Sequence, residues 1–181
     1  MAAKKLNEER DRLAASLAAS LPDSGGGYQV SSAFTAPERR RLLGPWSMEE
    51  HRVEGLPYID TFARTAIRGA QLLECVYASI YDFRESLCVK IVRISGLVDL
   101  PEGRAEYLYR LSVAISWELG RGFLIVRPEL GYQSTSLDGK AAAVKEFSSS
   151  GERTRIDYRF EGSSLILEEG ADFKRLTRGA E

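Results

Sequence analysis

The sequence predicts a mainly β fold, an antiparallel β-barrel of about eight strands, and two observations lead to it. Residues 106–119 alternate apolar and polar side chains, as a strand in a sheet with one buried face does. Short runs of the same kind recur between turn signals along the rest of the chain. Such spacing is typical of all-β sandwiches and barrels, and a chain that runs up and down in order removes its exposed edges by closing.

The composition sets the class of protein. The chain has 181 residues, 44% hydrophobic and 28% charged, which fits one globular domain with extensions. The net charge of −1 provides no basic surface for nucleic acid or an anionic membrane, so neither partner is expected. The run Arg39–Arg41 is interpreted as a solvated helix face.

The sequence also indicates a compartment. No apolar run reaches the ~20 residues of a membrane span, and Lys4 and Lys5 are followed by charged residues where a signal peptide has its apolar core. We therefore expect a soluble, cytoplasmic protein. Cys75 and Cys88 lie in apolar runs and are interpreted as buried free thiols.

Two regions are predicted. Residues 1–27 form a helical extension and a Gly-rich linker, and residues 28–181 form the barrel domain. Leucines and alanines at helical spacing predict a helix over 4–21, and Pro22 with the glycines at 25–27 ends it. The apolar stripe of this helix is narrow, so it docks on the body, on a protein partner or on a second copy, or it frays.

Two further helices precede the main run of strands. Thr35-Ala36-Pro37-Glu38 has the form of a capping box with proline just inside the helix, and Gly44-Pro45 ends that helix. Residues 57–71 suit either a helix or an irregular strand, and their apolar spacing favours the helix. A connection is expected at 97–103. Strands are expected at 46–53, 72–83, 87–95, 106–119, 123–127, 132–136, 140–148, 154–160, 165–167 and 173–176.

Several segments resemble the lipocalins and related calycin barrels. Gly44-Pro45-Trp46 is similar to the Gly-x-Trp that opens their first strand after a short helix. Residues 115–126 resemble the central hairpin, and residues 158–167 the final hairpin, of small bacterial lipocalin-like domains. The resemblance covers roughly residues 35–178, and residues 54–71 depart from a simple barrel.

The resemblance implies a barrel-closing pair and an interior site. Trp46 would be covered by an arginine near the last strand, and Arg175 occupies that place. A guanidinium over an indole gains roughly 0.5–2 kcal/mol. The interior of such a barrel either is filled by side chains or takes one small apolar molecule. The candidate pocket residues are Val113, Ile115, Trp117, Leu119, Tyr158 and Phe160.

No catalytic constellation is evident, so the chain is not expected to be an enzyme. His51, the single histidine, follows Glu49-Glu50 in a charged segment with no nucleophile beside it in sequence. One histidine and two distant cysteines fall short of a metal site, and no cofactor is expected.

Two functional hypotheses remain. The first is a lipocalin-like module that binds a small hydrophobic ligand inside the barrel. The second is a structural or interaction module with a filled barrel, whose residues 4–21 dock a partner. The alternating side chains of the strand ending at Leu119 are common to both, because they either fill the interior or line a pocket.

Overall fold

The computed structural model describes residues 36–65, 67, 70–148 and 152–178. The predicted helix over 4–21, the linker after it and Thr35 of the capping box lie outside the described residues. The predicted short helix before the first strand is confirmed as α2, Ala36–Leu42.

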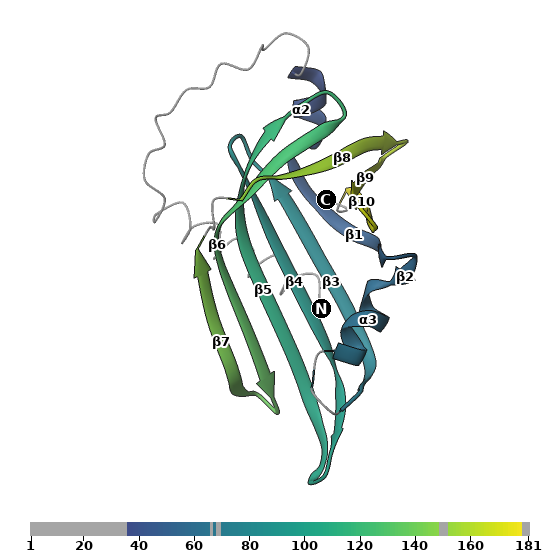
Figure 1. Ribbon diagram of the computed structural model, residues 1–181, viewed down its shortest axis with the longest axis vertical. Helices are drawn as coiled ribbons and strands as arrows, with labels where there is room; N and C mark the ends of the chain where they lie inside the picture. The colour runs from purple at the N-terminus through teal and green to yellow at the C-terminus, as the bar shows by residue number, and fades with distance from the viewer. Residues whose placement is uncertain (1–35, 66, 68–69, 149–151, 179–181) are drawn as a thin grey trace.

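Within the described residues, eight antiparallel strands close into a barrel, which confirms the predicted fold class (Figure 1). Their order around the barrel is β1-β3-β4-β5-β6-β8-β9-β10, and β10 pairs with β1 to complete the ring. The strands of the ring are β1 (Gly44–Val53), β3 (Leu72–Phe83), β4 (Leu87–Leu100), β5 (Gly103–Leu119), β6 (Phe123–Leu137), β8 (Thr154–Glu161), β9 (Ser164–Glu169) and β10 (Asp172–Arg178). The short β2 (Leu56–Pro57) pairs with β1, and β7 (Lys140–Ser148) pairs with β6 outside the ring.

The central strands are longer than the sequence predicts. The expected connection over 97–103 is wrong: β4 continues to Leu100, opposite Gly103 at the start of β5. Only Pro101 and Glu102 separate them, and Gly103 has a φ of +130°, which glycine adopts without a steric penalty. The segments predicted separately at 123–127 and 132–136 form one strand, β6.

On the edge of β6 that faces away from β5, two different strands pair in succession, and this divides the sheet into two parts. Its first residues, 123–126, pair with β8, whereas 130–137 pair with β7. The ring therefore closes at one end, and β3 to β7 extend beyond it as an open sheet (Figure 1).

Helix α3 (Tyr58–Thr65) packs beside that extension. The expected helix within 57–71 is thus confirmed for eight residues, and a bridge between Ile67 and Ala70 follows it. Ala63 of α3 joins a packed cluster with Leu72, Val98, Ala105 and Tyr107.

The closed end of the barrel has its own core. Its buried members come from α2 and from all eight strands of the ring: Leu42, Trp46, Tyr81, Phe83, Cys88, Trp117, Leu119, Leu124, Tyr158, Leu165, Leu167 and Leu176. Cys88 is a buried free thiol as predicted, while Cys75 is half-buried.

The arginines of α2 cover this core, contrary to their interpretation as a solvated face. The Arg39 guanidinium lies 4.7 Å from the centroid of the Trp117 ring, and that of Arg41 lies 3.9 Å from Phe160; Arg40 is exposed. Guanidinium groups are weakly hydrated and stack on aromatic faces. Two of the three arginines therefore seal the barrel end.

Candidate functional site

A β-bulge in β1 turns His51 toward the barrel interior. Trp46 and Met48 contact the core of the closed end, so strict alternation would point residue 50 inward and residue 51 outward. The register with β10 shifts between Met48 and Glu50, which leaves Glu49 as the extra residue. Beyond it His51 pairs with Lys174, and both lie on the inner face. One inserted residue reverses the faces of the rest of the strand.

Both ring nitrogens of His51 are engaged. Nε2 lies 2.8 Å from Oδ1 of Asp172, and Nδ1 lies 3.0 Å from the hydroxyl of Tyr77. An ionised Asp172 only accepts, so Nε2 of His51 carries a proton and donates to it. Tyr58 of α3 stacks on the ring at 4.2 Å between centroids. The histidine thus connects β1, β3, β10 and α3.

Asp172 is the anion of this network. Burial by itself would raise the pKa of its carboxyl, but hydrogen bonds from His51 and Lys174 outweigh burial and lower the pKa to about 2. The Lys174 ammonium pairs with Asp172 and is 6% exposed. A buried ammonium without such a partner would be costly, so the two residues depend on each other.

Lys90 adds a second amine to the interior. It pairs in register with Tyr81 of β3 and Val113 of β5. It is two residues from Cys88 of the core, so its side chain is on the same, inner face of β4. Among the described residues no carboxylate lies within 4 Å of its Nζ, and the contact observed is with the Tyr81 ring at 5.4 Å. Burial lowers the pKa of Lys90, while Tyr58 and Asp172 act in the opposite direction.

Ser79 adds an unsatisfied hydroxyl. It lies between Tyr77 and Tyr81 on the inner face of β3 and is 3% exposed. By geometry its Oγ has no hydrogen-bond partner in the described part of the chain, although it lies close enough to Tyr77 to lower the pKa of that hydroxyl. A buried hydroxyl in that state carries a desolvation cost of about 1–3 kcal/mol, which a polar ligand atom would remove.

We name this group the interior polar cluster. Its members are His51, Tyr58, Tyr77, Ser79, Tyr81, Lys90, Asp172 and Lys174. It lies between the core of the closed end and the cluster under α3. Along the inner face of β5, Trp117 and Tyr107 are buried at the two ends, while Leu111 and Tyr109 between them are half-buried. The middle of the barrel therefore combines polar groups with the half-buried Leu111 and Tyr109, and Tyr109 packs against Phe62 of α3.

The cluster is better suited to binding than to hydrolysis. A general base needs a free lone pair beside a nucleophile, and both ring nitrogens of His51 are already engaged, by Asp172 and by Tyr77. Burial raises the pKa of Tyr77 well above its usual range, so its hydroxyl stays protonated. The groups with free capacity are the Lys90 amine and the Ser79 hydroxyl.

The predicted pocket residues lie nearer the closed end. Trp117, Leu119 and Tyr158 belong to the packed core, and Ile115 and Phe160 pack against it. Val113 is buried at 7% exposure and faces the interior beside Lys90.

The predicted barrel-closing pair needs a correction. The guanidinium over Trp46 is that of Arg178, 4.3 Å from the ring centroid, and Arg178 is opposite Trp46 in the β1–β10 register. Arg175 has the opposite parity from the buried Leu176 and lies on the outer face, where it pairs with Glu50 and Glu161. Alternation along the strand explains the difference, since residues 174, 176 and 178 share the inner side.

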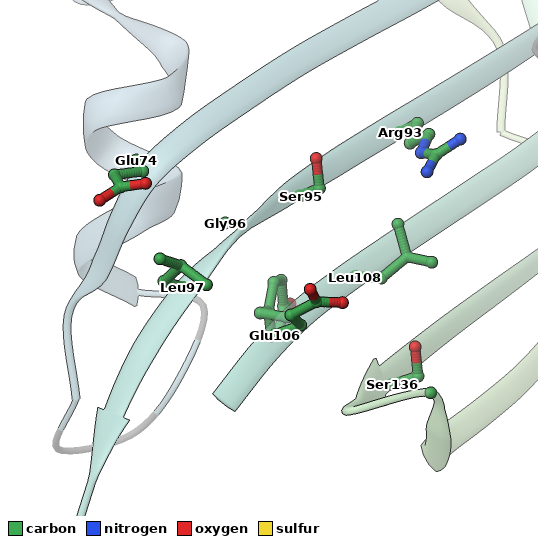
Figure 2. A pocket seen from close by; sticks show the side chains of 10 residues that line it. Glu74, Arg93, Ser95, Gly96, Leu97, Glu106, Leu108 and Ser136 are labelled. Atoms are coloured by element: carbon green, nitrogen blue, oxygen red, sulfur yellow. The ribbon is translucent and has the colours of Figure 1, made fainter. Parts of the chain in front are cut away.

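Surface hollows are also present. One of about 410 Å³ lies on the outer face of the sheet extension (Figure 2). Arg93, Ser95, Glu106 and Leu108 line it from β4 and β5, and Glu74 lies at one side, on β3. Both glutamates are exposed. Another hollow, of about 370 Å³, lies between α3 and β3. Neither is lined by the predicted pocket residues or by the interior polar cluster.

Sequence reasoning missed the interior polar cluster because its members are spread from residue 51 to residue 174. The available signal was the position of Tyr77, Ser79 and Tyr81 at every second residue of one strand. The bulge at Glu49 gives no comparable signal.

Comparison of the chain with protein-family models, with curated proteins and with solved structures gives no match. Over the residues that the structure describes, no three His, Cys, Asp or Glu side chains form a group suited to a metal ion. No helix in that part of the chain is long and apolar enough to cross a membrane.

Proposed function

We propose that this protein is a lipocalin-like, calycin-type binding module that takes a small hydrophobic ligand into the middle of its barrel. The ligand's polar end lies at the interior polar cluster, and its apolar part lies along Leu111 and Tyr109. The observation that carries the proposal is the buried Ser79 hydroxyl without a partner, on the same inner face as a lysine without a carboxylate.

The proposal follows from the cost of those groups. A chain selected only to fill its barrel gains nothing from an unsatisfied buried hydroxyl and a half-buried amine without a carboxylate. Ligand pockets, in contrast, are mostly apolar with a few convergent polar groups. The proposed function involves no catalysis and no cofactor. We propose the cytoplasm of a bacterium as its location.

A fluorescent apolar probe, 1-aminoanthracene, tests the proposal on the full chain. Saturable binding with a change in tryptophan emission is expected. Leu111→Trp fills the interior and should weaken the probe's affinity by about tenfold, the effect of losing roughly 1.4 kcal/mol. Leu108→Trp, on the outer face of the same strand, is the matched control and should bind as the wild type does. Absence of saturable binding, or equal effects of the two variants, would contradict the proposal.

The alternative is a structural or interaction module, and the filled core of the closed end favours it. In that case the barrel takes no ligand, and residues 4–21 dock a protein partner or a second copy. Deleting residues 1–27 and measuring the molar mass by light scattering decides between a docked and an unused extension. A monomer before and after the deletion, with no partner lost in a pull-down, would eliminate this alternative.

A further inference from the structure

We propose that Lys90 captures a hydrophobic aldehyde as a reversible imine inside the barrel, with Ser79 as the hydroxyl that holds the carbonyl oxygen. This inference rests on the proposed binding function and names the chemical class of the ligand. It describes stoichiometric capture and release, and no turnover is required.

Ser79 and Lys90 lie on neighbouring strands and face the same side of the sheet. Tyr81 is directly opposite Lys90, and Ser79 is opposite Val92, so Ser79 and Lys90 are diagonal neighbours on the inner face. Diagonal neighbours in antiparallel strands have Cα atoms about 7–8 Å apart, within reach of a long side chain. The amine of Lys90 and the hydroxyl of Ser79 are therefore placed to contact one and the same carbonyl group of a ligand.

The amine of Lys90 differs from that of Lys174 in having no carboxylate partner among the described residues. Lys174, the other lysine of the interior polar cluster, is paired with Asp172, so its amine is already engaged. Lys90 has no such carboxylate among the described residues, and its contact is with an aromatic ring. Enclosure lowers the pKa of Lys90, and Tyr58 and Asp172 oppose that shift. Desolvated lysines of this kind are the ones that form Schiff bases.

The hydroxyl of Ser79 is placed to act as a hydrogen-bond donor to the ligand. Ser79 Oγ is buried without a hydrogen-bond partner, so it can donate to a ligand oxygen without breaking an existing bond. An aldehyde oxygen, which becomes an alkoxide-like oxygen as the amine attacks, is a better acceptor in the transition state than in the ground state. Ser79 thus favours the attack as well as the binding.

The chemistry balances without an oxidant or a reductant. The lone pair of the neutral Lys90 amine forms a bond to the carbonyl carbon, and one amine proton moves to the oxygen. The resulting carbinolamine then loses its hydroxyl with the second amine proton as water, and the carbon–nitrogen double bond forms. Addition of water reverses both steps and releases the aldehyde.

Decanal with sodium cyanoborohydride, applied to the full chain, tests the inference. The reductant converts an imine to a stable secondary amine, so intact-mass and peptide analysis locate the decyl group. We expect one decyl group, on Lys90. Lys90→Gln should reduce the extent of modification by about tenfold or more, and Lys145→Gln, on the exposed strand β7, should leave it unchanged. Circular dichroism shows that each variant is folded.

Further arms separate this inference from the proposed function. Decanol has the same chain without the carbonyl, and its displacement of 1-aminoanthracene measures non-covalent binding alone. Decanol binding without a Lys90 adduct would overturn the imine and leave the binding function. Binding of neither compound would overturn both. Equal modification of Lys90 and the exposed Lys140 and Lys145 would also overturn the inference, and Ser79→Ala with an unchanged rate would remove Ser79 from the site.

Discussion

Oδ1 of Asp172 on the last strand lies 2.8 Å from Nε2 of His51 on the first strand, and this contact is made inside the barrel where β10 and β1 close the ring. Asp172 also pairs with Lys174. The same carboxylate therefore supports the closure of the barrel and the orientation of His51, and several of the following predictions test that double role.

The Asp172 carboxyl makes stability depend on pH. Its pKa is about 2 in the folded protein against an ordinary value of 3.8. A lowered folded-state pKa means that its contribution is present above about pH 4 and is lost as the pH falls toward pH 2. The side chain is 28% exposed, so the contribution is on the order of 1–2 kcal/mol.

Urea unfolding across that pH range measures the effect. Asp172→Asn should show a flatter dependence of the free energy of unfolding on pH than the wild type. Asp99→Asn, at an exposed pair with Arg104, is the control and should keep the wild-type slope. Identical slopes for wild type and Asp172→Asn would contradict the prediction.

The Asp172–Lys174 pair should show strong coupling. Asp172→Asn leaves the buried ammonium without its counter-charge, and Lys174→Met leaves the carboxylate with only His51. We expect each single variant to lose about 2–4 kcal/mol, because breaking a buried pair costs more than removing it whole. The double variant should lose about 1–3 kcal/mol less than the sum of the singles. Chemical denaturation of the wild type, the two single variants and the double variant completes this double-mutant cycle. A double variant whose loss equals the sum of the two single losses would contradict the predicted coupling.

Arg178, not Arg175, should stabilise the barrel end. The Arg178 guanidinium covers Trp46 and also donates to the carbonyl oxygens of Leu43 and Arg41. Arg178→Ala should lower the free energy of unfolding by about 1–2 kcal/mol and shift the emission of Trp46. Arg175→Ala removes only half-exposed surface pairs and should cost less than about 0.5 kcal/mol. Thermal unfolding compares the two variants, and the reverse order of stability would contradict the assignment.

The bulge at Glu49 should matter more than its side chain. Deleting Glu49 makes the alternation of β1 continuous, which turns His51 outward and breaks its bonds to Asp172 and Tyr77. We expect a loss of about 3 kcal/mol or more, since a buried network is broken. Glu49→Ala keeps the bulge and removes an exposed side chain, so it should stay within about 0.5 kcal/mol of the wild type.

Because the chain has one histidine, its imidazole NMR signals report directly on the bulge. The deletion should move them toward those of a solvated histidine, and Glu49→Ala should leave them in place. Unchanged imidazole signals in a folded deletion variant would show that the bulge does not orient His51.

Much of the fold could be predicted from local pattern. The period-two alternation of β5 and the turn residues around β8 and β9 each fix an element without reference to the rest of the chain. The misplaced boundaries, such as the continuous β6 and the tight turn at Pro101 and Glu102, are places where pairing with a long neighbour overrides a local signal.

The candidate site was much less predictable. The sequence favoured the apolar positions from Val113 to Leu119, and most of these pack in the closed end. The polar positions that the structure brings together come from β1, α3, β3, β4 and β10, and no spacing in the sequence relates them. Arg175 was predicted from its position near the last strand. Leu176 faces the interior, so Arg178, two residues further on, is the arginine on the inner face.

The sequence by itself determined that the chain forms antiparallel strands with one apolar face and that a short helix precedes the first of them. It did so because side-chain periodicity and turn chemistry act over a few residues. Only the tertiary structure decided which side chains meet inside the barrel. Ring closure between β10 and β1, and one bulged residue at Glu49, set the direction of His51 and its neighbours, and both depend on partners far apart in the chain.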